Sequence, residues 1–158
     1  MRIRLNKKGF TLIELLIVVA IIGIIAAIAI PNLLNAIQRG KQKRSMADMR
    51  AVGTAVEAFA VDNNRYPDDA SPVSNITDDV EPIYIKKVPT QDGWETAFDY
   101  ASDPDSAAQS YTISSYGKNK IQDGDCAGST YKGITTNFNN DICFSQGSFT
   151  QFPEGIQQ

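Results

Sequence analysis

The chain has 158 residues, a length that suits one modest domain with an accessory element and gives no case for two independent folds. It contains no histidine, the side chain that most often serves in acid–base catalysis and metal binding near neutral pH. The net charge of -3 is divided unevenly, because residues 62–158 hold 15 Asp and Glu against 6 Lys and Arg, a net of -9. Composition therefore disfavours an enzyme. Nucleic-acid binding is disfavoured too, because basic and aromatic residues do not interleave in the acidic part.

An apolar run begins at Phe10 and continues to Ile30, with Glu14 as its single charged residue. As a helix its 21 residues would be about 31 Å long, close to the roughly 30 Å hydrocarbon core of a bilayer. Basic residues precede the run without any acidic one, which predicts a cytoplasmic N-terminus and an outer location for the remaining chain. A cleavable secretory signal is the rival interpretation, because residues 27–29 (AIA) resemble a signal-peptidase site.

Beyond the apolar run, the pattern becomes that of an amphipathic helix that continues to about Val61. Turn-forming residues and a proline at 62–67 then end the helix. Apolar residues stand three apart at Leu34 and Ile37, and then recur at steps of three and four at Met46, Met49, Val52 or Gly53, Val56 and Phe59 or Ala60. Short strand-like runs follow at residues 83–88, 97–101, 110–115, 141–144 and 148–152. The sequence thus predicts an α+β fold, in which a long N-terminal helix packs on a small antiparallel β-sheet.

Residues 7–16 (KKGFTLIELL) resemble the prepilin cleavage and assembly motif of the type IV pilin-like family. The resemblance implies a pilin-like fold, cleavage after Gly9 by a membrane prepilin peptidase, and methylation of the new Phe10 amine. Four parts follow from it: a basic leader at 1–9, a membrane and assembly helix at 10–31, its amphipathic continuation at 32–61, and a periplasmic globular domain at 62–158.

Glu14 needs a physical reason, because a charged side chain at the centre of a bilayer costs about 2.5 kcal/mol or more. The resemblance implies that its carboxylate pairs with the Phe10 amine of a neighbouring subunit in the filament. The alternative is a neutral, protonated carboxyl near the interface. Gly23 and Pro31 lower helix stability and bracket a stretch expected to loosen on assembly, although both residue types are also tolerated in ordinary membrane helices.

The outer part resembles the major (G-type) pseudopilin of type II secretion systems. The shared features are, in order, residues 65–67 (RYP), 84–89 (YIKKVP), 92–94 (DGW) and 111–117 (YTISSYG). The resemblance implies a structural subunit of a helical homopolymer that drives protein export across the outer membrane, with no catalytic residue. It also implies partners: further copies of the chain, an inner-membrane assembly platform, minor pseudopilins, and the membrane before assembly. The alternatives are a type IV pilus pilin for adhesion or motility, and a membrane-anchored periplasmic binding module.

Cys126 and Cys143 lie in the acidic half, where a disulfide is compatible with a location outside the cytoplasm. The alternative is two unrelated buried thiols. A bond between them would close a loop of 18 residues, counting both cysteines, and would contribute about 3 kcal/mol by constraining the unfolded chain.

No cofactor is required by this interpretation, but many pseudopilins of this type bind calcium in their C-terminal loops. Asp123, Asp125 and Asp141 supply the oxygen ligands that calcium prefers. An EF-hand loop is excluded, because Ala127 and Ile134 stand where that loop needs an acid and a glutamate. The three aspartates are therefore candidates for a looser calcium site, and solvated loop acids are the alternative.

Overall fold

The computed structural model describes residues 9–68, 71–103, 109–124, 126 and 132–157. The chain divides into two compact units, Met1–Ala36 and Ile37–Gln158. Helix α1 (Leu12–Asn63) contributes to both units. The short helices η1 (Val73–Ile76) and α2 (Thr77–Val80) and the strands belong to the second unit.

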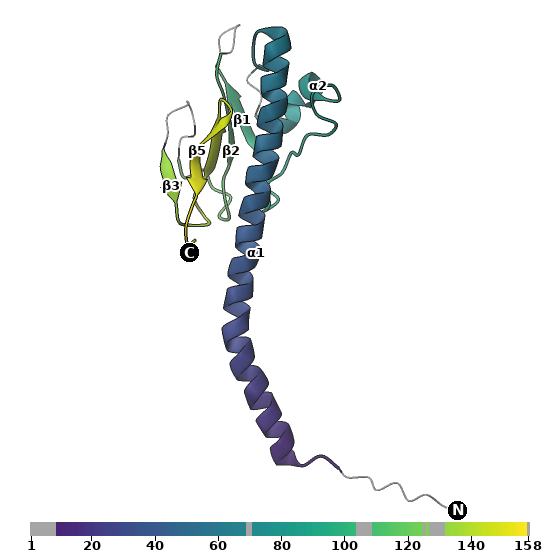
Figure 1. The fold of residues 1–158 in the computed structure, drawn as a ribbon, viewed down its shortest axis with the longest axis vertical. Helices are drawn as coiled ribbons and strands as arrows, with labels where there is room; N and C mark the ends of the chain where they lie inside the picture. The colour runs from purple at the N-terminus through teal and green to yellow at the C-terminus, as the bar shows by residue number, and fades with distance from the viewer. Residues whose placement is uncertain (1–8, 69–70, 104–108, 125, 127–131, 158) are drawn as a thin grey trace, which may run out of the picture. The chain divides into compact units, whose positions relative to one another are not determined.

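Among the described residues, five strands form one sheet in the order β1-β2-β4-β5-β3 (Figure 1). Their bounds are β1 Asp99–Ser102, β2 Tyr111–Ser115, β3 Gly133–Thr135, β4 Ile142–Ser145 and β5 Ser148–Pro153. All neighbours pair antiparallel except β3 and β5, which are parallel. The predicted α+β class, with a long helix on a small and mostly antiparallel sheet, is confirmed.

The C-terminal half of α1, from Ile37 to Asn63, packs on this sheet through the predicted face. We call it the outer half. Met49, Val52, Val56 and Phe59 are all buried, at the spacing of three and four residues that places them on one side of a helix. They join side chains from β1, β2 and β4 in a single core. Burial of each large apolar side chain contributes about 1.5–3 kcal/mol, so this face holds the helix to the sheet.

Strands β4 and β5 form a hairpin through Gln146 and Gly147. Both turn residues have positive φ, 48° and 79°, as a tight two-residue hairpin turn requires. Ser145 pairs with Ser148 directly across this turn. The hairpin thus fixes the last strand beside the middle of the sheet.

The strand predicted at residues 83–88 is wrong. The backbone N–H groups of Tyr84 and Ile85 both donate to the carbonyl of Val80, and the Val88 N–H donates to the Glu81 carboxylate. These bonds fold the segment back onto α2, so its backbone does not pair with a strand of the sheet. The sequence pattern also missed β3, whose three residues are too few to show an alternation.

A turn at residues 92–94 is built around the buried side chain of Asp92. Its Oδ1 accepts the backbone N–H groups of Trp94 and Thr96 at 2.8 and 2.9 Å, and its Oδ2 accepts the Ser115 hydroxyl at 2.7 Å. Because both carboxylate oxygens are satisfied, Asp92 ties the turn to β2 at little desolvation cost.

The same turn is fastened to α1. Gly93 N–H donates to Ser45 Oγ at 2.8 Å, and Trp94 Nε1–H donates to Gln38 Oε1 at 2.7 Å. A Cβ on Gly93 would overlap the backbone of Lys41, so only glycine permits this approach. The turn therefore fixes the start of the outer helix half against the sheet.

We expect Gly93→Ala to lower the free energy of unfolding by about 1–3 kcal/mol, because the added methyl meets helix backbone that cannot rotate away. Thermal unfolding of the full-length protein in detergent, followed by circular dichroism, measures this. Gly124→Ala is the matched control, since its nearest neighbour would lie 3.9 Å away. Equal unfolding midpoints for the two variants would show that Gly93 does not approach the Lys41 backbone closely.

Candidate functional site

The start of α1 is closed by reciprocal hydrogen bonds between Thr11 and Glu14. The backbone N–H and the hydroxyl of Thr11 donate to Glu14 Oε2 at 2.8 and 2.7 Å, and Glu14 N–H donates to Thr11 Oγ1 at 3.3 Å. This arrangement is a capping box, which satisfies N–H groups that a helix start leaves unpaired. Glu14 thus has a partner within its own chain, and its pairing with the Phe10 amine of another subunit stays a prediction.

Thr11 is absent from the residues predicted to form the site. A threonine three positions before a glutamate, directly ahead of an apolar run, is nevertheless the sequence signature of a capping box. The adjacent Gly9 and Phe10, at the predicted cleavage point, are both exposed. An exposed bond is what a peptidase needs, and cleavage after Gly9 stays a prediction.

The first half of α1 carries an apolar surface that none of the described residues buries. It contains an 18-residue window with a mean hydropathy of 3.1, none of it buried, so this helix is long and apolar enough to cross a membrane. The exposed side chains, from 45 to 81% accessible, are Phe10, Leu12, Ile13, Leu15, Leu16, Ile17, Val18, Val19, Ile21, Ile22, Ile24, Ile25, Ile28, Ile30, Leu33, Leu34 and Ile37. A surface of this extent requires lipid or other protein to cover it.

The predicted loosening points, Gly23 and Pro31, both lie inside a continuous α1. Pro31 lacks an N–H and removes one backbone hydrogen bond from this helix. Beside it, the Asn32 side-chain amide donates to the Ile28 carbonyl at 3.0 Å. The helix of a single chain therefore tolerates both residues, and loosening on assembly stays a prediction.

Two of the three predicted calcium ligands come together at Asp141. Its Oδ2 accepts the backbone N–H groups of Asp123 and Gly124, each at 3.0 Å. Its Oδ1 is buried and has no hydrogen-bond partner among the described residues. Burial raises the pKa of the Asp141 carboxyl, and the two N–H donors oppose that rise.

This arrangement fits a metal ion only in part. The free Oδ1 of Asp141 is a suitable hard ligand for calcium, and the Asp123 backbone lies beside this carboxylate, but Asp123 Oδ2 accepts the Asn119 side-chain amide at 2.6 Å. Within the residues that the structure describes, however, no three acidic or cysteine side chains gather into a metal-binding group. Asp125, the third predicted ligand, lies outside the described residues. Calcium normally takes six to eight oxygens, so backbone carbonyls and water would have to complete the shell.

A disulfide joins Cys126 to Cys143, which confirms the pairing that the sequence predicted. Their Cα atoms are 5.5 Å apart, and both residues are buried. Cys143 lies on β4 two residues after Asp141, so the bond holds the loop that carries Asp123 against the sheet. The loop is thus fixed covalently at one point and by the Asp141 hydrogen bonds at another.

The fold and the sequence together define a pilin-like filament subunit. An apolar helix follows a basic N-terminal segment, and a small sheet packs on the C-terminal half of this helix. The model of the prokaryotic N-terminal methylation motif matches residues 4–30, and the model of type II secretion system protein G matches residues 32–131. The second match covers most of the chain. The chain therefore belongs to the type II secretion system protein G family.

Curated relatives agree with this assignment. The chain is 34% identical over 108 residues to the type II secretion system core protein G of Aeromonas hydrophila, covering 61% of this chain and 74% of that protein. It is 32% identical over 109 residues to the protein of the same name from Vibrio cholerae, covering 63% and 74%. It is also 48% identical over 68 residues to the type IV major pilin PilA of Myxococcus xanthus, covering 43% of this chain but 31% of that pilin.

Replacing both cysteines by serine should lower the free energy of unfolding by about 3 kcal/mol, because the unfolded chain regains the freedom of the closed loop. Urea denaturation of the full-length protein in detergent, with and without reductant, measures the loss. Reductant should shift the unmodified protein and leave the double variant unchanged. A double variant as stable as the oxidised protein would mean that the bond contributes nothing to the fold.

Proposed function

We propose that this chain is the major subunit of a type II secretion pseudopilus, a helical homopolymer that drives folded proteins through an outer-membrane pore. The main support is the wholly exposed apolar half of α1, together with the family match over residues 32–131. An apolar helix of this kind is covered by lipid before assembly and by helices of other copies afterwards. The role is structural and requires no catalytic residue and no cofactor.

Cleavage between Gly9 and Phe10 would create a free amine at the start of the apolar helix, and the methylation-motif match supports this step. A methylated amine keeps its positive charge. In a dry filament core that charge needs a counter-ion, and Glu14 of an adjacent copy is the acid within the apolar run. A subunit added out of register would leave both charges unpaired, so the pair selects the correct axial step.

The apolar helix supports a single crossing of the inner membrane before assembly, with the globular part in the periplasm. The basic residues ahead of it support a cytoplasmic N-terminus. A prepilin peptidase, an inner-membrane assembly platform and minor pseudopilins are the partners that this route requires. Energy for growth would come from a cytoplasmic ATPase, because the filament subunit itself only polymerises.

A surface type IV pilus is the second candidate. The Myxococcus xanthus pilin match and the Cys126–Cys143 disulfide favour it. The two candidates differ in where the filament ends. A pseudopilus stays within the periplasm at native expression and its loss stops protein export, whereas a pilus extends from the cell and its loss stops adhesion or motility.

Glu14→Ala should leave membrane insertion and processing intact but reduce sheared filaments by about tenfold or more, since losing one partner of a buried ion pair costs about 3–5 kcal/mol. Mass spectrometry of the membrane-bound protein gives the processing state. We expect it to begin at Phe10 with one added methyl group. Immunoblots of sheared filaments give the assembly yield.

Asp103→Ala is the matched control for Glu14, because it removes an exposed acid from the globular part. Normal filaments from Glu14→Ala would remove this residue from the mechanism. A mature chain that begins after Ala29 would instead show that the protein is a secreted domain, and the leader assignment would fail.

Calcium binding is a further part of this proposal, with Asp141 and Asp123 as the residues that would hold the ion. At a hundredfold excess over its dissociation constant, calcium should stabilise the protein by about 2.7 kcal/mol. Asp141→Asn should abolish that gain but still fold, because the amide oxygen still accepts the two backbone N–H groups. Thermal unfolding in calcium and in chelator measures both effects.

Asp78→Ala serves as the control for the calcium experiment, since Asp78 is an exposed acid on α2, an element apart from the Asp141 loop. It should keep the full calcium response. An unmodified protein with the same midpoint in calcium and in chelator would show that Asp141 is a structural cap for its loop and not a ligand.

A further inference from the structure

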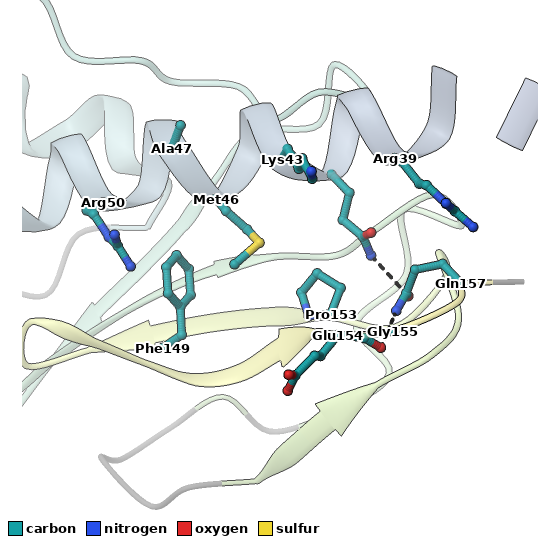
Figure 2. Close-up of a pocket in the computed structure, with 11 residues that line it drawn as sticks. Arg39, Lys43, Met46, Ala47, Arg50, Phe149, Pro153, Glu154, Gly155 and Gln157 are labelled. Carbon is teal, nitrogen blue, oxygen red and sulfur yellow. Dashed lines mark hydrogen bonds between the residues drawn. The ribbon is translucent and has the colours of Figure 1, made fainter. Parts of the chain in front are cut away.

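A groove of about 730 Å³ lies between the outer half of α1 and strand β5 (Figure 2). Its lining residues come from α1 on one side and from β5 and the C-terminal segment on the other: Arg39, Gln42, Lys43, Met46, Ala47, Arg50, Phe149, Pro153, Glu154, Gly155 and Gln157. All of them belong to the second unit of the chain. We call this feature the basic groove.

The described residues give the basic groove a net positive charge. Arg39, Lys43 and Arg50 line it, against Glu154 as the one acidic lining residue. Among the described residues none of these three bases forms an ion pair. Arg50 lies over the Phe149 ring, 5.3 Å from its centroid, which leaves its outer N–H groups free for an acidic ligand.

The wall of the groove is apolar beneath these charges. Met46 and Phe149 are partly buried against the core, and Pro153 extends the same wall. A ligand that fits must therefore carry acidic groups beside an apolar side chain. This combination suits a polypeptide segment better than a small anion, because a small anion has no apolar surface to bury against the wall.

The chain itself exposes such a segment. Residues 77–83, which we call the acidic segment, contain Asp78 and Asp79 on α2, both exposed and, in the part of the chain that the structure describes, without an ion pair. Ile83 follows at 79% exposed. Two adjacent carboxylates and a nearby solvated isoleucine are complementary in both charge and polarity to the basic groove.

The two features lie on different sides of the second unit, Ile37–Gln158, which we call the globular unit. The acidic segment follows η1, whose Val73 N–H donates to the Phe98 carbonyl just before β1, at one edge of the sheet. The basic groove borders β5, near the other edge, and Figure 1 shows α2 and β5 on opposite sides of α1. A groove and a ligand on opposite sides of one molecule cannot meet within it. They make a heterologous, head-to-tail contact, which gives an open polymer when the rotation does not close.

We propose that the basic groove of one copy binds the acidic segment of the next copy, with Asp78 and Asp79 facing Lys43 and Arg50. Ile83 then packs on the apolar wall of the groove. This inference rests on the proposed filament function and adds to it a second, polar contact between globular units. The apolar helices supply adhesion between copies, and the charged contact sets their orientation.

Charge reversal and its rescue test the contact in the full chain. Lys43→Glu and Asp79→Lys, made singly, should each reduce sheared filaments by about tenfold, because each sets like charges opposite one another. The double variant restores an opposite-charge pair and should recover most of the yield. Lys118→Glu, at an exposed lysine outside the groove, is the matched control and should assemble normally.

Cysteines give a second readout that does not depend on rescue. Lys43→Cys combined with Asp79→Cys should form a ladder of cross-linked copies under oxidation, and neither single variant should form it. Single reversals that assemble normally, or a double variant no better than either single, would overturn the proposal while leaving filament formation by the unmodified chain intact. An unmodified chain without filaments would end the proposed function as well.

Binding of an anionic lipid headgroup is the competing use of the basic groove. Under that alternative, Lys43→Glu lowers sedimentation of the protein with phosphatidylglycerol vesicles, and the added Asp79→Lys does not restore it. That pattern, with unchanged filaments, would overturn the contact between copies.

Discussion

The structure depends on one constraint, which is that the first half of α1 exposes its apolar side chains, and none of its most apolar 18-residue window is buried among the described residues. Water cannot be the final environment of such a surface, because each exposed large side chain forgoes about 1.5–3 kcal/mol of burial. Lipid and other copies of the same helix are both adequate partners. Glu14 adds a second requirement, since a carboxylate in apolar surroundings is tolerated only with a partner. Thr11 provides that partner within the single chain, through the capping box.

The globular unit solves a different problem, which is to hold the outer half of α1 at a fixed position on a sheet. Apolar burial along one helix face provides adhesion but little positional precision. The turn at residues 92–94 adds that precision. The Gly93 N–H and the Trp94 indole N–H donate to the side chains of Ser45 and Gln38 on α1. Asp92, buried and fully hydrogen-bonded, keeps the turn rigid. Rigid attachment matters in a polymer, since a contact between globular units transmits register only if each unit is fixed to its own helix.

Periodicity predicted the parts of the fold that are long or regularly alternating. The helix was expected to end near Val61 and ends at Asn63, and strands β1, β2, β4 and β5 lie within two residues of their expected starts. The strand expected at residues 83–88 fails because β-branched residues also suit a segment tied back by Val80 and Glu81. Strand β3 and its parallel pairing depend on a partner distant in sequence, which no local pattern reveals. For the site, the sequence alone revealed the prepilin motif. The unpaired oxygen of Asp141 could be found only in the folded loop, because it depends on which groups surround that side chain.

The family match ends at residue 131, and the segment after it forms much of the sheet. Strands β3, β4 and β5 lie in it, as does Cys143, the second half of the disulfide. One wall of the basic groove is formed by Phe149 and Pro153 of the same segment. Apolar helices pack with one another at many offsets, so a filament of such helices gains little orientation from them alone. A directional contact must then come from polar surface, where unpaired or like charges make wrong offsets unfavourable. The globular unit offers this kind of surface in two complementary pieces, and their separation across the unit suits a chain that grows in one direction.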